Sequence, residues 1–223
     1  MTGAPATSPA GSGWTHRDAP PRGQIYAVLS TVFTFPDRRL HETILQEDWS
    51  GAVSAAVSRL PHSLRVPARG WGVPASYDRF QSEYIRLFEV GGRGGPPCPL
   101  HSGHYTSDRL RTMETLVRFY NFFGLAIVEG MMPDHASVEL EFMSYLIASE
   151  AGARSRAEAA SFLRAQHDFL RGHLAGWWPQ LAGQVIRNRP AAFYKSAVDL
   201  TLRFLRADER YVEQCLSNAR ETR

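Results

Sequence analysis

Five side chains that could support catalysis or metal binding lie in two short segments of this 223-residue chain. Cys98, His101 and His104 follow one another at intervals of three in a loop rich in glycine and proline. Asp134 and His135 come later, directly after a proline. Thiolate, imidazole and carboxylate groups are ligands for zinc and other transition metals. The residue types therefore allow a metal centre, although their spacing matches no single metal motif.

Cys98 is also a candidate nucleophile, with His101 or His135 as its base. It lies between two prolines, and no helix start is predicted beside it to lower the pKa of its thiol. The chain has no His-Glu-x-x-His segment of the kind found in metalloproteases, and the glycines of residues 91–95 lack the Lys-Ser/Thr ending of a phosphate-binding loop. A metal-dependent enzyme that uses Cys98, His101, His104 and His135 is therefore one alternative for this protein.

Asp134 and His135 open an apolar helix that we predict for residues 134–151. An aspartate in this position is expected to cap the helix, because its carboxylate accepts hydrogen bonds from free backbone N–H groups and contributes about 1 kcal/mol. Glu139 lies roughly one turn beyond His135 and can share its face, whereas Glu141 points elsewhere. From the residues alone, Asp134 and His135 could form a helix cap, a catalytic group or a recognition site.

Apolar residues recur three or four positions apart along most of the chain, which is typical of amphipathic helices. Gly124 and Pro179 are placed to end two of these helices, and no segment shows the alternation of a strand. The sequence therefore predicts an all-α fold. The expected helices span residues 24–35, 37–47, 49–60, 75–89, 107–123, 134–151, 155–178, 190–205 and 208–218.

Length and composition are those of a single globular domain. The chain is 43% hydrophobic and 21% charged, and it is long enough to bury a sizeable core. Residues 1–21 are predicted to be a disordered tail without a secretory signal, which leaves residues 22–223 as the helical domain. The two cysteines are expected to be reduced thiols in the cytoplasm. No apolar run is long enough for a membrane span, and the scattered charges, with a net charge of +3, argue against nucleic acid as a partner.

Four segments form a recognisable pattern. They read Tyr84-x-x-Leu87-Phe88, Pro99-Leu100-His101-Ser102, Phe119-Tyr120-x-x-Phe123-Gly124-Leu125 and Pro133-Asp134-His135-x-x-x-Glu139-Leu140-Glu141-Phe142-Met143. Between residues 24 and 206 the chain resembles the TorD/DmsD/NarJ family of molybdoenzyme maturation chaperones. The last of the four segments is the most specific.

The resemblance implies a cytoplasmic, non-enzymatic helical bundle without a cofactor, present as a monomer or homodimer. It also implies the partners: the apo form of a molybdopterin oxidoreductase of the DMSO-reductase type, and its twin-arginine leader (signal) peptide. The chaperone would assist cofactor insertion, folding and export proofreading. Asp134 and His135 fall on the family's Asp-His pair, which is associated with leader binding. The loop at residues 97–105 departs from the family pattern, which favours a dehydrogenase or an oxyanion reductase as the client.

A site for such a leader is physically reasonable. A carboxylate can hold a guanidinium through charge-assisted hydrogen bonds, and an apolar groove can hold the hydrophobic stretch that follows the arginines. A further alternative is a helical scaffold that binds the body of its client through an exposed apolar face. The residues expected to bind the peptide are Asp134, His135, Glu139, Leu87, Phe88, Pro99, Leu100 and Tyr105.

Overall fold

The computed structural model describes residues 19–46, 49–66 and 71–221, and within these ranges it contains helices and no strand. The prediction of an all-α fold is confirmed. None of the described helices combines the length and hydropathy needed to cross a bilayer. The helices are α1 (Ala19–Val32), α2 (Arg38–Gln46), α3 (Trp49–Val57), α4 (Tyr77–Tyr84), α5 (Arg109–Phe122), α6 (Ala136–Ala151), α7 (Arg156–Phe169), α8 (Ala175–Arg187) and α9 (Ala192–Glu221).

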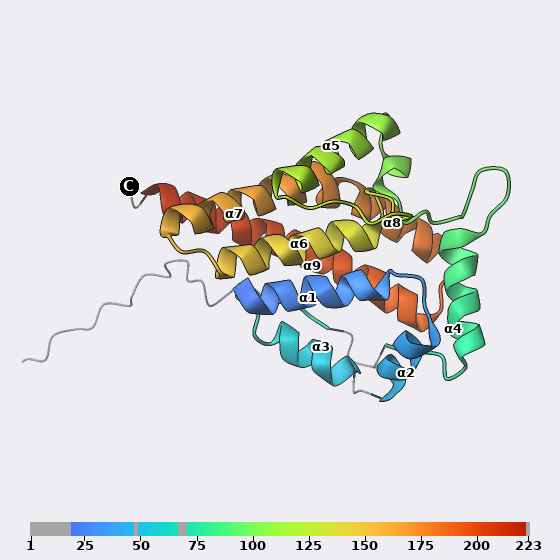
Figure 1. The fold of residues 1–223 in the computed structure, drawn as a ribbon. Coiled ribbons are helices and arrows are strands. Elements are labelled where there is room, and N and C mark those ends of the chain that lie inside the picture. Colours follow the sequence, from blue (N-terminus) through green and yellow to red (C-terminus); the bar gives the residue numbers. More distant parts are fainter. Residues whose placement is uncertain (1–18, 47–48, 67–70, 222–223) are drawn as a thin grey trace, which may run out of the picture.

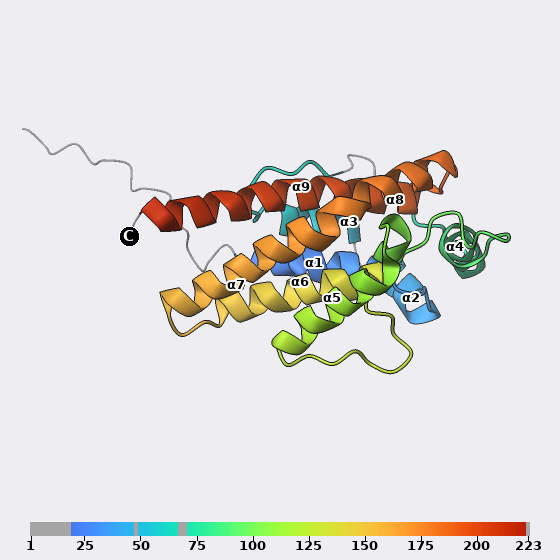
Figure 2. The ribbon, with the colours of Figure 1, turned by 90° about the horizontal axis from the view of Figure 1, so that it is seen from above.

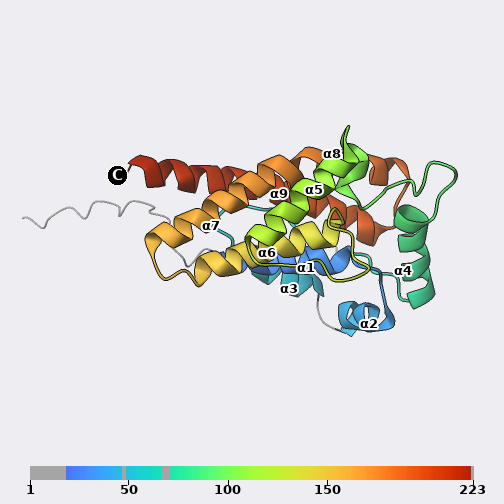
Figure 3. The same ribbon diagram turned by 45° about the horizontal axis from the view of Figure 1, so that its top comes forward.

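Helix α6 lies at the centre of the bundle, with α1 along one side and α7 along the other (Figure 1). The long helix α9 packs against α1, α7 and α8. Helix α4 stands across the common direction of the bundle at one end, and it is seen end-on from above (Figure 2). Helix α5 lies on the outside, over α6 and α7 (Figure 3). As a result, most residues of α5 are exposed or only partly buried.

Helices α1 and α6 approach each other closely at Gly23. A Cβ atom at this position would lie 3.3 Å from Cγ2 of Ile147, and the Ser144 hydroxyl donates a hydrogen bond of 3.0 Å to the Gly23 carbonyl. Leu140 and Met143 are fully buried, each at 0% exposure. Burial on almost every side explains why α6 is apolar around most of its circumference.

Local signals set several helix ends. The Asp108 carboxylate caps α5 by accepting a hydrogen bond of 3.0 Å from the Arg111 N–H. Gly124 follows α5 with a φ of 73°, a conformation that favours glycine, so the prediction that it ends this helix is confirmed. Ser155 caps α7 in the same way as Asp108, with a hydrogen bond from the Glu158 N–H.

Two helices are longer than predicted. The chain stays helical through a π-helical turn at Leu170–Leu174 and on to the end of α8, so the prediction that Pro179 ends a helix is wrong. Buried Trp178 and Leu181 flank the exposed proline, and their burial outweighs the missing hydrogen bond. Helix α9 likewise runs through the break expected before Asp208. At the other end of the chain, α1 includes residues 19–21, and the rest of the predicted tail lies outside the described residues.

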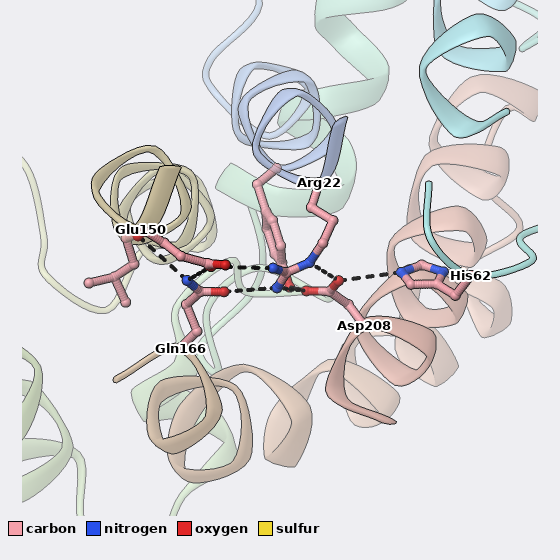
Figure 4. A network of polar contacts seen from close by, with 7 residues as sticks. Arg22, His62, Glu150, Gln166 and Asp208 are labelled. Atoms are coloured by element: carbon pink, nitrogen blue, oxygen red, sulfur yellow. Dashed lines mark hydrogen bonds and ion pairs between the residues drawn. The ribbon is translucent and has the colours of Figure 1, made fainter. Parts of the chain in front are cut away.

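A network of buried polar side chains ties four helices together (Figure 4). Arg22 of α1 donates to both carboxylate oxygens of Asp208 in α9, at 2.6 and 2.9 Å, and to Oε1 of Gln166 in α7 at 2.8 Å. Glu150 of α6 lies 3.6 Å from the same guanidinium, and His62 lies 3.3 Å from Asp208. A buried charge is tolerated only when it is paired and hydrogen-bonded. This network therefore fixes the relative positions of α1, α6, α7 and α9.

Candidate functional site

The loop before α5 is fastened to the start of α6 by main-chain hydrogen bonds. The Ser102 N–H donates to the Asp134 carbonyl at 2.8 Å, and the Ala136 N–H donates to the Leu100 carbonyl at 2.7 Å. These bonds place His101 opposite His135 across an antiparallel bridge. Two segments that the sequence singled out are therefore in direct contact, as predicted for a site.

Asp134 is fully buried and points into this loop. Its carboxylate lies 3.0 Å from Nδ1 of His101, accepts a hydrogen bond of 3.3 Å from the Gly103 N–H, and lies 3.9 Å from Nε of Arg109. Burial raises the pKa of this carboxyl, but the hydrogen bond and charge of His101, with Arg109 and the Gly103 N–H, outweigh burial and lower it. A Cβ atom at Gly103 would lie 2.8 Å from the carboxylate, so only glycine allows this close approach. Asp134 therefore fastens the loop to α6.

His135, and not Asp134, is the N-cap of α6. Its Nδ1 accepts a hydrogen bond of 3.3 Å from the Ser137 N–H and lies 2.7 Å from the Ser137 hydroxyl. Burial and the neighbouring His101 lower the pKa of His135 to about 4, so the ring is neutral at pH 7 and can accept this bond. The prediction that Asp134 caps this helix is wrong, because its carboxylate is turned away toward the loop.

The two glutamates of α6 have different environments. Glu139 is fully buried, and Trp177 Nε1 donates to its Oε2 at 3.1 Å. Burial raises the pKa of this carboxyl to about 8, so Glu139 is mostly protonated at neutral pH and contributes little negative charge. Glu141 lies on the exposed side of the helix. Of the two, only Glu141 can meet a cationic ligand directly.

The apolar residues predicted to bind a peptide mostly support the loop. Leu87, Phe88 and Leu100 are 0%, 3% and 1% exposed, and Pro99 is also buried. Tyr105 is half-buried, and its hydroxyl lies 2.9 Å from the carbonyl oxygen of Pro99 and 2.8 Å from a side-chain oxygen of α8, so it can donate to either. In this conformation only Tyr105 among these five reaches the surface.

Within the described residues, the structure does not assemble the catalytic or metal centre that the residue types allowed. Cys98 is fully buried, and the Asn188 amide donates to its sulfur at 3.6 Å. Burial raises the pKa of this thiol to about 11, so it is not a ready nucleophile at neutral pH. His101 and His104 have rings 6.2 Å apart. Within the described ranges, no three His, Cys, Asp or Glu side chains are grouped to hold a metal ion.

An apolar groove lies beside this corner, between the segment that follows α5 and the outer face of α6. Its volume is about 230 Å³, and we call it the α6 groove. Val128 is 73% exposed and Tyr145 is 36% exposed, and Glu141 is the acidic residue of its lining. The sequence contains an indication of this groove, because an apolar run lies between two predicted helices in a segment expected to be a loop. An analysis of helical periodicity does not detect such a run. The lining residues are Tyr120, Leu125, Ala126, Ile127, Val128, Met131, Val138, Glu141, Phe142 and Tyr145.

The contacts of Asp134 predict a structural effect. Asp134→Asn keeps the shape of the side chain but removes its charge, so we expect the free energy of unfolding to fall by about 1–3 kcal/mol. Urea unfolding measures this loss. Asp168→Asn is a matched control, because that side chain is 68% exposed and its ion pair is worth little. Equal stabilities of the two variants would show that Asp134 does not fasten the loop.

Comparisons with known proteins agree with the sequence pattern. The family model described as nitrate reductase delta subunit matches residues 46–183. The selenate reductase assembly chaperone protein of Thauera selenatis is 34% identical over 70% of this chain and 72% of its own length. The chlorate reductase assembly chaperone protein of Ideonella dechloratans is 32% identical over 69% of this chain and 71% of its own length.

One solved structure is similar as well. It is a putative redox enzyme maturation protein from Archaeoglobus fulgidus, with 20% identity and a TM-score of 0.47, and the match covers 86% of this chain and 93% of that one. The family model covers more than half of the chain, and both curated relatives are named as assembly chaperones and not as enzymes. The chain therefore belongs to the nitrate reductase delta subunit family, and its resemblance to molybdoenzyme maturation chaperones is confirmed.

Proposed function

We propose that this protein is a cytoplasmic, non-enzymatic chaperone for the catalytic subunit of a molybdopterin oxidoreductase that reduces an oxyanion. The observation that carries the proposal is the similarity, over about 70% of the chain, to chaperones named for selenate and chlorate reductases. The chaperone binds the apo subunit and its twin-arginine leader. It holds back export until the cofactor is inserted and the subunit is folded.

We assign the leader to the α6 groove. A twin-arginine leader combines two guanidinium groups with an apolar stretch, and the groove combines an exposed carboxylate, Glu141, with an apolar lining. Charge-assisted hydrogen bonds orient the arginines. Burial of the apolar stretch supplies about 25 cal/mol for each Å² removed from water, before the entropic cost of ordering the peptide.

Asp134 and His135 act in this proposal as positioning residues. Asp134 is buried, so it does not meet a guanidinium group of the leader in this conformation. The segment that ends at Pro133 forms one wall of the groove through Met131, and the Tyr120 hydroxyl donates to the Pro133 carbonyl at 2.8 Å. By fixing the backbone directly after this wall, the two residues set the shape of the groove.

A titration of the full chain with a twin-arginine leader peptide of a molybdoenzyme tests this assignment by calorimetry. Val128→Asp and Glu141→Gln should each weaken binding by about tenfold, since each removes about 1.4 kcal/mol. Replacing both leader arginines by glutamine should weaken binding to the wild type but add little further loss in Glu141→Gln, because the two changes remove the same contact. Leu45→Asp on α2, at a residue 46% exposed, is the matched control and should leave affinity unchanged.

The possible outcomes distinguish an error in the assigned binding site from an error in the proposed function. Unchanged affinity in Val128→Asp and Glu141→Gln would place the leader elsewhere on the chain. Binding of a leaderless apo subunit, with no binding of the peptide, would favour a scaffold for the client body. That scaffold would use exposed apolar side chains such as Phe122, which is 82% exposed. No binding of either would contradict the chaperone function itself.

A further inference from the structure

Two neighbouring methionines lie at the surface beside the α6 groove. Met131 is 43% exposed and Met132 is 36% exposed. By contrast, Met143 is fully buried, at 0%, and Met113 is partly buried. Met131 belongs to the lining of the groove, whereas Met132 lies outside that lining. Within the described residues, the most exposed sulfur-containing side chains are therefore adjacent in sequence, and one of them lines the groove proposed for the leader.

Backbone hydrogen bonds hold Met131 on both sides. Its N–H donates a hydrogen bond of 3.0 Å to the Val128 carbonyl, which closes a four-residue turn. Gly130, the third residue of this turn, has a φ of 84°, a conformation that favours glycine. Directly after Met131, the Met132 carbonyl accepts a hydrogen bond of 3.1 Å from the His135 N–H. The Met131 side chain therefore extends from an anchored backbone into the wall of the groove.

The thioether of Met131 is a chemical target as well as an apolar group. Hydrogen peroxide oxidises a methionine in one two-electron step. The sulfur lone pair attacks one peroxide oxygen and the O–O bond breaks, so that an S=O bond forms and the second oxygen leaves as water with both protons. The two cysteines compete poorly for the oxidant. Cys98 and Cys215 are 0% and 5% exposed, and burial raises the pKa of the Cys98 thiol to about 11.

The side chains of the groove offer no spare donor to a methionine sulfoxide. Two residues of the described lining bear a hydroxyl group, Tyr120 and Tyr145. The Tyr120 hydroxyl already donates to the Pro133 carbonyl at 2.8 Å. The Tyr145 hydroxyl donates to the Phe123 carbonyl at 3.3 Å. Glu141, when ionised, adds only acceptor oxygens. A leader that covers an oxidised Met131 would therefore bury a polar oxygen without a partner from the lining, which is unfavourable.

We propose that Met131 is an oxidation site that regulates leader binding. With the thioether reduced, this part of the groove wall is apolar and the leader binds. With the sulfoxide in its place, the leader binds about tenfold more weakly, which is equivalent to about 1.4 kcal/mol. A methionine sulfoxide reductase reverses the change, because a dithiol supplies two electrons, the oxygen leaves as water and the dithiol becomes a disulfide. This regulation rests on the proposed assignment of the leader to the α6 groove.

Treatment of the full chain with hydrogen peroxide, stopped with catalase, tests the proposal. Peptide mass spectrometry should find sulfoxide at Met131 and Met132 but not at buried Met143. Calorimetric titration with a twin-arginine leader peptide that contains no methionine or cysteine should then show binding about tenfold weaker than before oxidation. Treatment with methionine sulfoxide reductases and dithiothreitol should restore the affinity. A saturating amount of the same peptide, added before the peroxide, should slow oxidation of Met131 but not of Met132.

Variants of the two neighbouring methionines identify the sulfur that matters. Met131→Leu cannot form a sulfoxide, so its leader affinity, whatever the starting value, should not change on treatment with peroxide. Met132→Leu is the matched control and should lose affinity on oxidation as the wild type does. Met131→Gln places a polar side chain in the groove wall without any oxidant, so it should bind the leader about tenfold more weakly than Met132→Gln does.

The results that contradict this regulation differ from those that contradict the chaperone function. Unchanged leader affinity in wild type that carries sulfoxide at Met131 would overturn the regulation. An equal loss of affinity in oxidised Met131→Leu would overturn it as well, because the effect would then come from another residue. An absence of leader binding to the untreated wild type would instead contradict the assignment of the leader itself.

Discussion

Replacing Asp208 by alanine should lower the free energy of unfolding by about 3 kcal/mol. The substitution leaves the Arg22 guanidinium buried, with a side-chain exposure of 1%, after the loss of its two hydrogen bonds to Asp208, at 2.6 and 2.9 Å. Glu150 remains 3.6 Å away and compensates only in part. Because folded domains are stable by about 5–15 kcal/mol, this loss is a large share of the total. Urea unfolding followed by circular dichroism measures it.

Asp199→Ala, on the same helix, is the control for this prediction. Asp199 forms an ion pair of 2.7 Å with Arg203, but its side chain is 55% exposed. Exposed pairs contribute about 0–1 kcal/mol, so this variant should unfold almost as the wild type does. A loss in Asp208→Ala no greater than in Asp199→Ala would show that the buried network does not stabilise the bundle.

The second large effect is a dependence on pH that comes from Glu139. The fold raises the pKa of this carboxyl from 4.5 to about 8, so folding favours the protonated form. The stabilisation linked to this proton is complete below pH 4.5 and is lost as the pH rises through 8. Glu139→Gln has no proton to lose and keeps an oxygen that can accept from Trp177. Relative to this variant, the wild type should lose on the order of 4 kcal/mol between pH 5 and pH 9.

Unfolding free energies of the wild type and Glu139→Gln at a series of pH values give this difference directly. All other ionisable groups are the same in both proteins, so their contributions cancel when the two curves are subtracted. A difference that stays constant from pH 5 to pH 9 would mean that Glu139 is already ionised in the folded protein.

Much of the fold follows from local sequence signals. Apolar spacing located most helices, and Gly124 ended α5 where its conformational freedom is needed. The errors occurred where tertiary burial overrode a local breaker. Pro179 lies within α8 because buried side chains on both sides hold the helix, and Asp208 lies inside α9 because it pairs with a residue at the other end of the chain.

The candidate site was harder to predict than the fold. The sequence grouped His101 with His135 by residue type, and the structure brings their backbones together, but the sequence could not show which carboxylate faces solvent. Helix α6 is apolar on almost every side, so periodicity gives no direction for its few acidic residues. Only the packing of its neighbours turns Glu139 inward and leaves Glu141 outside. Asp134 points inward because a loop with a glycine at position 103 folds over it.

The buried network also determines when this protein can finish folding during its synthesis. Arg22 and Asp208 are 186 positions apart in sequence, and contacts between distant residues form slowly because a long loop must close first. A nascent chain that still lacks α9 exposes Arg22 without its carboxylate, so the four-helix junction is completed only after α9 has left the ribosome. Chains that lack α9 are therefore kept from forming the finished bundle.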